Sequence, residues 1–258
     1  LNGMWAFVIY DRRQRRLFGS RDRFGVKPLY YSRDNTVIQF ASEIKALRAS
    51  GYQSSGINWR TASRFLLEGR LDSRNETFYE GIEQIPPGSG FEVGLDGAWH
   101  QWAFWSMDAL PRTVTTNPAE TFADLFEDSV RIRMRSDVPV GVCLSGGLDS
   151  TAIICAAARH RDESAGAQPE SLQAFCYMAK EFDESKYIAD TLVQTHAQLR
   201  QLETSPADLW NDLRKVLWFQ DEPVHTMTAV VGYQLMRLAA SLGIRVVLNG
   251  QGADETIG

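Results

Sequence analysis

The feature that most constrains the fold of this chain is a glycine-containing loop between a predicted strand and a predicted helix. The apolar run 138–144 predicts a buried strand, 148–160 predicts a helix, and Ser145-Gly146-Gly147-Leu148-Asp149-Ser150 joins them. Glycines let backbone N–H groups turn towards a ligand, and a helix N-terminus adds unpaired N–H groups and a positive dipole end. The loop therefore predicts a phosphate site, with hydroxyl donors at Ser145 and Ser150 and an oxygen for Mg²⁺ at Asp149. The alternative is a tight turn with a good helix cap.

The segments after this loop alternate between strand and helix. Strands are predicted over 172–178, 198–203 and 244–248, and helices over 184–196, 209–219 and 230–242. Such alternation is typical of a doubly wound, Rossmann-like parallel sheet covered on both faces. The loop differs from a Walker A loop because no lysine follows its glycines.

A second loop, Asn249-Gly250-Gln251-Gly252-Ala253-Asp254-Glu255, follows the last predicted strand. Loops at the carboxyl ends of parallel strands share one edge of the sheet, where ligands bind. We therefore expect Asp254 and Asp149 to hold one metal ion between them, or else Asp254 to belong to a solvated acidic turn. Asp221-Glu222-Pro223-Val224 could face the same edge and bind a cationic group, or simply end a helix before proline.

Two further polar features do not lead to a predicted functional site. Glu181-Phe182-Asp183-Glu184 is interpreted as a charge cluster at the start of a helix. The four histidines show no metal-ligand spacing, so we predict no zinc site.

The first 110 residues predict an antiparallel, sheet-rich unit. Residues 5–10 form a strand expected to be buried on both faces, 17–21 pairs back onto it, and 29–31 pairs with 37–41. Further strands are predicted over 91–95 and 99–105, and helices start at the caps Ser42 and Asn58. We expect a first domain over 1–110, a linker over 111–118 and a second domain over 119–258, which begins at a capping box of Asn117, Pro118 and Glu120.

Composition excludes several classes of protein. The net charge of −5 favours neither nucleic acid nor an acidic membrane as a partner, and the apolar run 152–158 is much shorter than the roughly 18 residues of a membrane span. The three cysteines, Cys143, Cys155 and Cys176, are interpreted as small hydrophobic residues of a reducing, cytoplasmic protein. No signal peptide is predicted, both ends resemble cuts within a longer protein, and a homodimer is possible.

Several motifs in order resemble one family. Ser145 to Ser150 resembles the SGGxDS signature of the PP-loop ATP pyrophosphatases. Residues 135–141, 221–223 and 249–255 resemble asparagine synthetases in particular, and residues 3–7, 21–31 and 41–47 resemble the latter part of that family's glutaminase domain.

The resemblance implies a glutamine-hydrolysing asparagine synthetase. An N-terminal part of a class II glutamine amidotransferase, an Ntn α/β/β/α sandwich, would free ammonia from glutamine. The second domain would bind ATP and aspartate and form β-aspartyl-AMP and pyrophosphate. Ammonia would then attack the activated carbonyl to give asparagine and AMP. By resemblance, Asp149 and Gln251 are the catalytic residues and Asp149 and Asp254 the Mg²⁺ ligands. The ATP site implied in this way comprises Leu144 and Tyr177 beside the adenosine, the loop Ser145, Gly146, Gly147, Leu148, Asp149 and Ser150, and the backbone of Asn249 and Gly250.

The chain departs from the family pattern at two positions. The family's glutaminase nucleophile is an N-terminal cysteine, whereas residue 1 is leucine and the first cysteine is Cys143, so the chain as given is not expected to hydrolyse glutamine. Gln251 stands where some members have glutamate, and an amide cannot act as a general base. Two alternatives remain: a related adenylating enzyme of the β-lactam synthetase or lasso-peptide cyclase type, and a non-catalytic nucleotide-binding protein.

Overall fold

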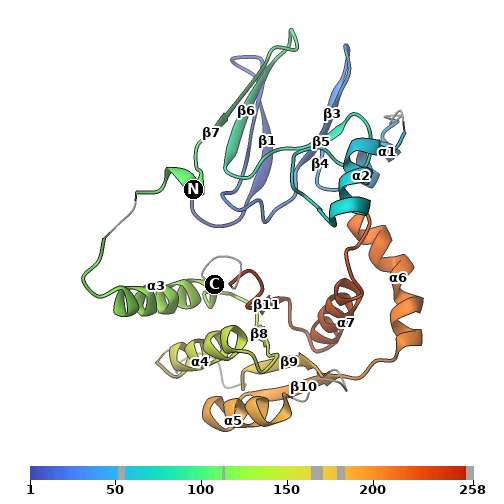
Figure 1. Cartoon of the computed structure of the whole chain (residues 1–258). Coiled ribbons are helices and arrows are strands. Elements are labelled where there is room, and N and C mark those ends of the chain that lie inside the picture. Colours follow the sequence, from blue (N-terminus) through green and yellow to red (C-terminus); the bar gives the residue numbers. More distant parts are fainter. Residues whose placement is uncertain (52–55, 112–113, 164–170, 179–183, 254–258) are drawn as a thin grey trace. The chain divides into compact units, whose positions relative to one another are not determined.

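The chain forms two compact units in the computed structural model, which describes residues 1–51, 56–111, 114–163, 171–178 and 184–253 (Figure 1). One unit comprises Leu1–Thr113 together with Leu217–His225, and the other comprises Val114–Val216 together with Thr226–Gly258. The sequence pattern did not predict that residues 217–225 belong with the first hundred. The domain and linker limits expected from the sequence stay predictions.

The first unit is built on two antiparallel sheets. The larger has the order β1-β2-β6-β7 and the smaller the order β4-β3-β5. Their strands are β1 (Ala6–Asp11), β2 (Arg16–Arg21), β3 (Tyr30–Arg33), β4 (Ile38–Ala41), β5 (Ile82–Gln84), β6 (Ser89–Gly94) and β7 (Trp99–Ala103). A shared core of Leu29, Tyr31, Ile85, Phe91 and Val93 lies between the sheets. The predicted pairing of residues 17–21 with the first strand and of 29–31 with 37–41 is confirmed.

Helix α1 (Ile44–Ala49) covers the outer face of the smaller sheet. Ile44 and Leu47 pack with Ile82 of β5, while neighbouring Tyr30 and Tyr31 of β3 point to opposite faces. The predicted cap at Ser42 is wrong: the N-cap is Glu43, and its side chain makes no capping bond to the described helix. The predicted cap of α2 (Trp59–Glu68) is confirmed, because Asn58 accepts a hydrogen bond from the Thr61 amide at 3.3 Å.

One prediction about β1 is wrong for the described residues. The all-apolar strand was expected to be buried on both faces, yet Ile9 is 54% and Tyr10 48% exposed. Ala6 and Val8, which share a face with Tyr10, do contact the core between the sheets, so burial on that face is partial.

The second unit is built on a parallel sheet, as predicted, and its strand order is β10-β9-β8-β11. Its strands are β8 (Val140–Cys143), β9 (Gln173–Tyr177), β10 (Gln198–Leu202) and β11 (Val246–Leu248), and every neighbouring pair is parallel. The helices are α3 (Pro118–Arg133), α4 (Leu148–Glu163), α5 (Ser185–Thr195), α6 (Pro206–Gln220) and α7 (Thr228–Ser241), and a short 3₁₀ helix, η1 (Met107–Ala109), precedes them in the first unit. The capping box is present, because Asn117 accepts from the Glu120 amide and donates to its carboxylate.

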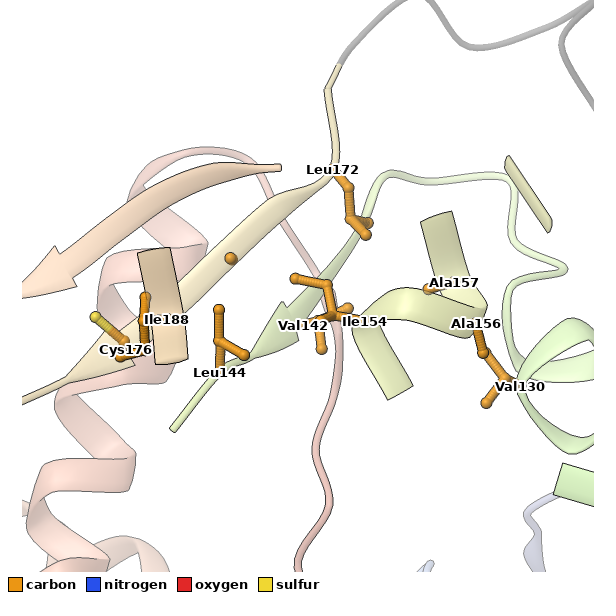
Figure 2. Close-up of a cluster of buried hydrophobic side chains, with 10 residues drawn as sticks. Val130, Val142, Leu144, Ile154, Ala156, Ala157, Leu172, Cys176 and Ile188 are labelled. Carbon is orange, nitrogen blue, oxygen red and sulfur yellow. The ribbon is translucent and has the colours of Figure 1, made fainter. Parts of the chain in front are cut away.

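Helices cover both faces of this sheet. Ala174 and Cys176 of β9 lie in a core with Val130 of α3, Ile154 of α4 and Ile188 of α5 (Figure 2). Phe175, between them in the strand, points to the other face and packs with Ala239 of α7 and Ile244. The predicted fold class, an antiparallel sandwich followed by a doubly wound parallel sheet, is therefore confirmed. Among the described helices, none is both long and apolar enough to cross a membrane.

Candidate functional site

The strand order of the second unit places a ligand crevice between β8 and β11. The chain runs from β8 outwards to β9 and β10 and then returns to the other side of β8 as β11. In an open α/β sheet, this reversal marks the point where the loops at the carboxyl ends diverge and a ligand can enter. Leu248 of β11 is paired with Val142 of β8, so the two predicted loops start side by side.

The loop from Ser145 to Ser150 has the shape of an anion cradle. Gly146 has a φ of +83°, which side chains disfavour, and α4 begins at Leu148 with Asp149 in its first turn. The Ser145 amide donates to Ser150 Oγ at 3.1 Å, and the two hydroxyls lie 3.0 Å apart. Ser150 is buried and also bonds the Gly147 carbonyl, so its hydroxyl holds the shape of the loop.

The second loop touches the first through Gly250. A Cβ on Gly250 would lie 2.9 Å from the Cβ of Asp149 and 3.2 Å from the Ser150 amide nitrogen, so only glycine fits without displacement. The following turn is tied by the Gln251 amide, which donates to Asn249 Oδ1 at 3.2 Å. Asn249, Gly250 and Gln251 are thus brought to the start of α4, beside Asp149.

The remaining predicted site residues are placed differently from one another. Tyr177 ends β9, the neighbour of β8, and so lies along the same edge of the sheet. Leu144 is 1% exposed, its side chain packs in the core and its amide donates to the Phe175 carbonyl at 2.8 Å, whereas Leu148 is 85% exposed. Asp254 lies outside the described residues, and the pairing of Asp149 with Asp254 stays a prediction.

The structure also brings Glu184 to the cradle, which the sequence interpretation missed. A Cβ on Gly146 would lie 2.8 Å from the Cβ and 3.4 Å from Oε2 of Glu184, the residue that precedes α5. The available signal was position: the charge cluster follows β9, whose carboxyl end lies on the ligand edge. Residues 181–183 of that cluster are outside the described residues.

Asp221 and Glu222 group with the first unit, and their carboxylates are engaged there, while the prediction that they face the ligand edge stays a prediction. The Ile44 amide donates to Asp221 Oδ2 at 2.8 Å, and the Phe78 amide donates to Glu222 Oε1 at 2.7 Å. The cationic group that Asp221 contacts is the Lys45 side chain, whose Nζ lies 3.2 Å from its carboxylate.

The cradle suits phosphate oxygens and offers oxygen ligands for Mg²⁺. Backbone N–H groups, two hydroxyls and a helix N-terminus favour an anion, and the Asp149 carboxylate is the ligand type that Mg²⁺ prefers. Among the described residues, no group of three or more His, Cys, Asp or Glu side chains forms a ready-made metal site. Mg²⁺ in proteins commonly takes part of its coordination from substrate phosphate oxygens.

A doubly wound sheet with a glycine loop at its switch point, which follows an antiparallel sandwich in the chain, defines an α/β class of protein joined to a second module. The family model described as asparagine synthase matches residues 121–258, and the one described as a glutamine amidotransferase domain matches residues 1–105. The chain therefore belongs to the asparagine synthase family.

Three relatives illustrate the similarity. The chain is 31% identical to asparagine synthetase [glutamine-hydrolyzing] 1 of Bacillus subtilis, aligning over all of this chain and 40% of the relative. It is also 31% identical to putative asparagine synthetase [glutamine-hydrolyzing] 2 of Methanocaldococcus jannaschii, over all of this chain and 49% of that protein. Amidase chry2 of Gibberella zeae is 26% identical over all of this chain and 40% of its own length. The chain thus spans less than half the length of these relatives.

Proposed function

We propose that the whole protein is an ATP-dependent carbon–nitrogen ligase that converts aspartate to asparagine through β-aspartyl-AMP, with ammonia drawn from glutamine. The observation that best supports it is the contact of Gly250 with Asp149 at the switch point, because it joins two loops into one phosphate-facing site. Family membership supports the same reaction class.

The chemistry explains why such a cradle is needed. A carboxylate is a poor acyl donor until one of its oxygens becomes part of a good leaving group, and adenylation achieves this. Pyrophosphate must then be stabilised as it departs. The N–H groups of the Ser145–Ser150 loop and the N-terminus of α4 are held in place before the reaction and act on that developing charge. Mg²⁺, held by Asp149 and Asp254, would neutralise phosphate oxygens.

The other site residues are assigned roles by family resemblance, and their positions in the second unit are compatible with those roles. Asn249 and Gly250 approach the adenosine through their backbone, and Tyr177 flanks it from the end of β9. Leu144 supports the start of the loop by packing in the core. Gln251 orients a reacting group by hydrogen bonding, because its amide cannot take up a proton.

The test is an assay on the full-length protein with ATP, Mg²⁺, aspartate and ammonium, following pyrophosphate, AMP and asparagine. We expect all three products together. Asp149→Ala should abolish pyrophosphate release while circular dichroism stays unchanged, because Asp149 is partly exposed and lies outside the core clusters. Full turnover by this variant would show that the cradle has another role.

A second candidate is amidation of a different carboxylic acid. The observation that favours it is the similarity to proteins named amidases, chry2 of Gibberella zeae and chyE of Penicillium rubens. Pyrophosphate release with another acid and none with aspartate would establish this candidate. Nucleotide binding with no release for any acid would indicate a non-catalytic protein.

A further inference from the structure

A carboxylate lies against the start of the cradle, the loop of residues 145–150. Glu184 directly precedes α5, and its carbonyl accepts a hydrogen bond from the Ile188 amide of that helix at 3.1 Å. A Cβ on Gly146 would lie 2.8 Å from the Cβ, 3.3 Å from the carbonyl oxygen and 3.4 Å from Oε2 of Glu184. Glu184 and Gly146 both belong to the second unit, so their contact lies within one compact body.

The position of Glu184 follows from the order of the strands. Strand β9 runs parallel to β8, with Phe175 paired to Cys143, so the chain leaves both strands at the same edge of the sheet. Gly250, which follows β11 on the other side of β8, approaches the cradle at Asp149. Glu184 therefore meets the loop at its start, and Gly250 meets it at the first turn of α4.

Local structure makes no use of the Glu184 carboxylate. The side chain is exposed and forms no capping hydrogen bond to the described part of α5. It also forms no ion pair or other hydrogen bond with the residues that the structure describes. Asn117, by contrast, caps α3 with its side chain, and Ser150 uses its hydroxyl to hold the loop. A reason for a carboxylate at this position is therefore to be sought in what the cradle binds.

A carboxylate beside an anion site affects two forms of the same ligand in opposite ways. The loop amides and the N-terminus of α4 attract a triphosphate whether or not it carries a metal ion. The Glu184 carboxylate repels the phosphate oxygens, whereas it attracts a divalent cation bound to them. Specificity is a difference between two affinities, and a repulsive group often supplies it. The donors thus provide affinity, and the carboxylate distinguishes the two forms.

We propose that Glu184 is a specificity-determining residue, which makes the cradle select the Mg²⁺ complex of a nucleoside triphosphate over the free anion. The inference deepens the proposed function and rests on it, since it concerns the same site and takes ATP as the ligand. Selection of the metal complex suits adenylation, because pyrophosphate then leaves with part of its charge already neutralised.

The experiment measures ATP binding to the full-length protein by calorimetry, without aspartate, once in excess Mg²⁺ and once in EDTA. The quantity compared is the dissociation constant of free ATP divided by that of the Mg²⁺ complex. Glu184→Gln removes the charge and nearly keeps the shape, whereas Glu184→Asp keeps the charge. The matched control is Asp190→Asn, which removes another exposed carboxylate from the same helix. Circular dichroism checks that each variant is folded.

For Glu184→Gln we expect this ratio to fall about tenfold, because free ATP binds more tightly and the Mg²⁺ complex more weakly. Glu184→Asp and Asp190→Asn should both stay close to wild type. An unchanged ratio in Glu184→Gln would overturn the proposal, and so would equal weakening of both forms, which would indicate a purely structural role. An equal fall in Glu184→Asp or in Asp190→Asn would also overturn it, because the charge beside Gly146 would then not be responsible. Wild-type protein that binds ATP under neither condition would instead count against the proposed function.

Discussion

At the scale of single residues, the candidate site depends on two close approaches that only glycine permits. Gly146 combines a φ of +83° with contact to Glu184, and Gly250 lies against Asp149 and Ser150. At both positions the sequence predicted that the backbone comes close to a ligand. The structure adds the neighbours that make that freedom necessary.

We predict that Gly250→Ala lowers ATP-dependent pyrophosphate release by about a hundredfold, because the new Cβ would lie 2.9 Å from the Cβ of Asp149 and displace the loop. The matched control is Gly232→Ala, in the interior of α7, where a Cβ meets no described atom within 4 Å. That variant should keep its activity and gain about 0.4–1 kcal/mol of stability in urea unfolding. Equal activity of the two variants would contradict the close approach of the loops.

Glu222 makes the stability of the first unit depend on pH. Burial raises the pKa of Glu222 from 4.5 to about 7, partly offset by the bond from the Phe78 amide and reinforced by the nearby Asp72 and Asp221 carboxylates. A folded pKa above the unfolded one favours the protonated form, so the stability contributed by Glu222 is complete below about 4.5 and is lost as pH rises through about 7.

We therefore expect the free energy of unfolding of the first unit to decline from about pH 5 to about pH 8, and Glu222→Gln to flatten that decline. Glutamine keeps an acceptor for the Phe78 amide but cannot ionise, which makes it a matched replacement. The measurement is the urea midpoint, followed by tryptophan fluorescence, across this range. A decline of the same size in the variant would assign the pH dependence to another group.

At the scale of elements, the turn after β2 is organised by a buried carboxylate. Asp22 is 1% exposed and accepts hydrogen bonds from the amides of Trp5, Phe24, Val26 and Lys27. Burial by itself would raise the pKa of Asp22, but these donors outweigh it and hold the pKa below its ordinary value of 3.8. The stability that Asp22 adds is therefore present above that value and is lost as pH falls through the lowered pKa.

Asp22→Ala should destabilise the first unit by about 3 kcal/mol or more, because each buried N–H left without an acceptor costs about 1–3 kcal/mol. Asp34→Ala is the matched control, since Asp34 accepts from the Thr36 and Val37 amides in an exposed turn. Water can replace the carboxylate there, so the control should shift the urea midpoint much less. Similar shifts for both variants would show that burial of Asp22 does not determine its contribution.

At the scale of the whole molecule, the chain connects its two compact units at more than one place. The chain connects the two units at Thr113–Val114 and again on both sides of residues 217–225, which belong to the first unit. A cut at the first connection alone therefore leaves residues 217–225 attached to the first unit by the bonds of Asp221, Glu222 and His225.

We predict that a protease site inserted between residues 113 and 114 can be cut without separating the pieces on gel filtration. Adding Asp221→Ala should make the cut pieces separate at lower urea concentration, because the strongest attachment is then lost. The uncut variant serves as the control for folding. Immediate separation of the cut wild-type pieces would mean that the bonds of residues 217–225 contribute little to holding the pieces together.

The sequence by itself determined the character of each half. Hydrophobic periodicity distinguished antiparallel strands before residue 110 from alternating strands and helices after 119. Apolar residues recur every two positions in a half-buried strand and about every 3.6 in a helix, so both patterns can be recognised from the sequence alone. It also identified the loops at Ser145 and Asn249, because glycine, serine and aspartate between a strand and a helix have few other uses.

Only the tertiary structure decided which distant residues meet. The strand order β10-β9-β8-β11 brings Gly250 to Asp149, and the core takes up the side chain of Leu144. The cap of α1 comes from Asp221 in place of Ser42, across 177 residues. Propensity and period describe neighbours along the chain, whereas a hydrogen bond of this kind depends on where the fold brings two remote segments, and no local pattern records that.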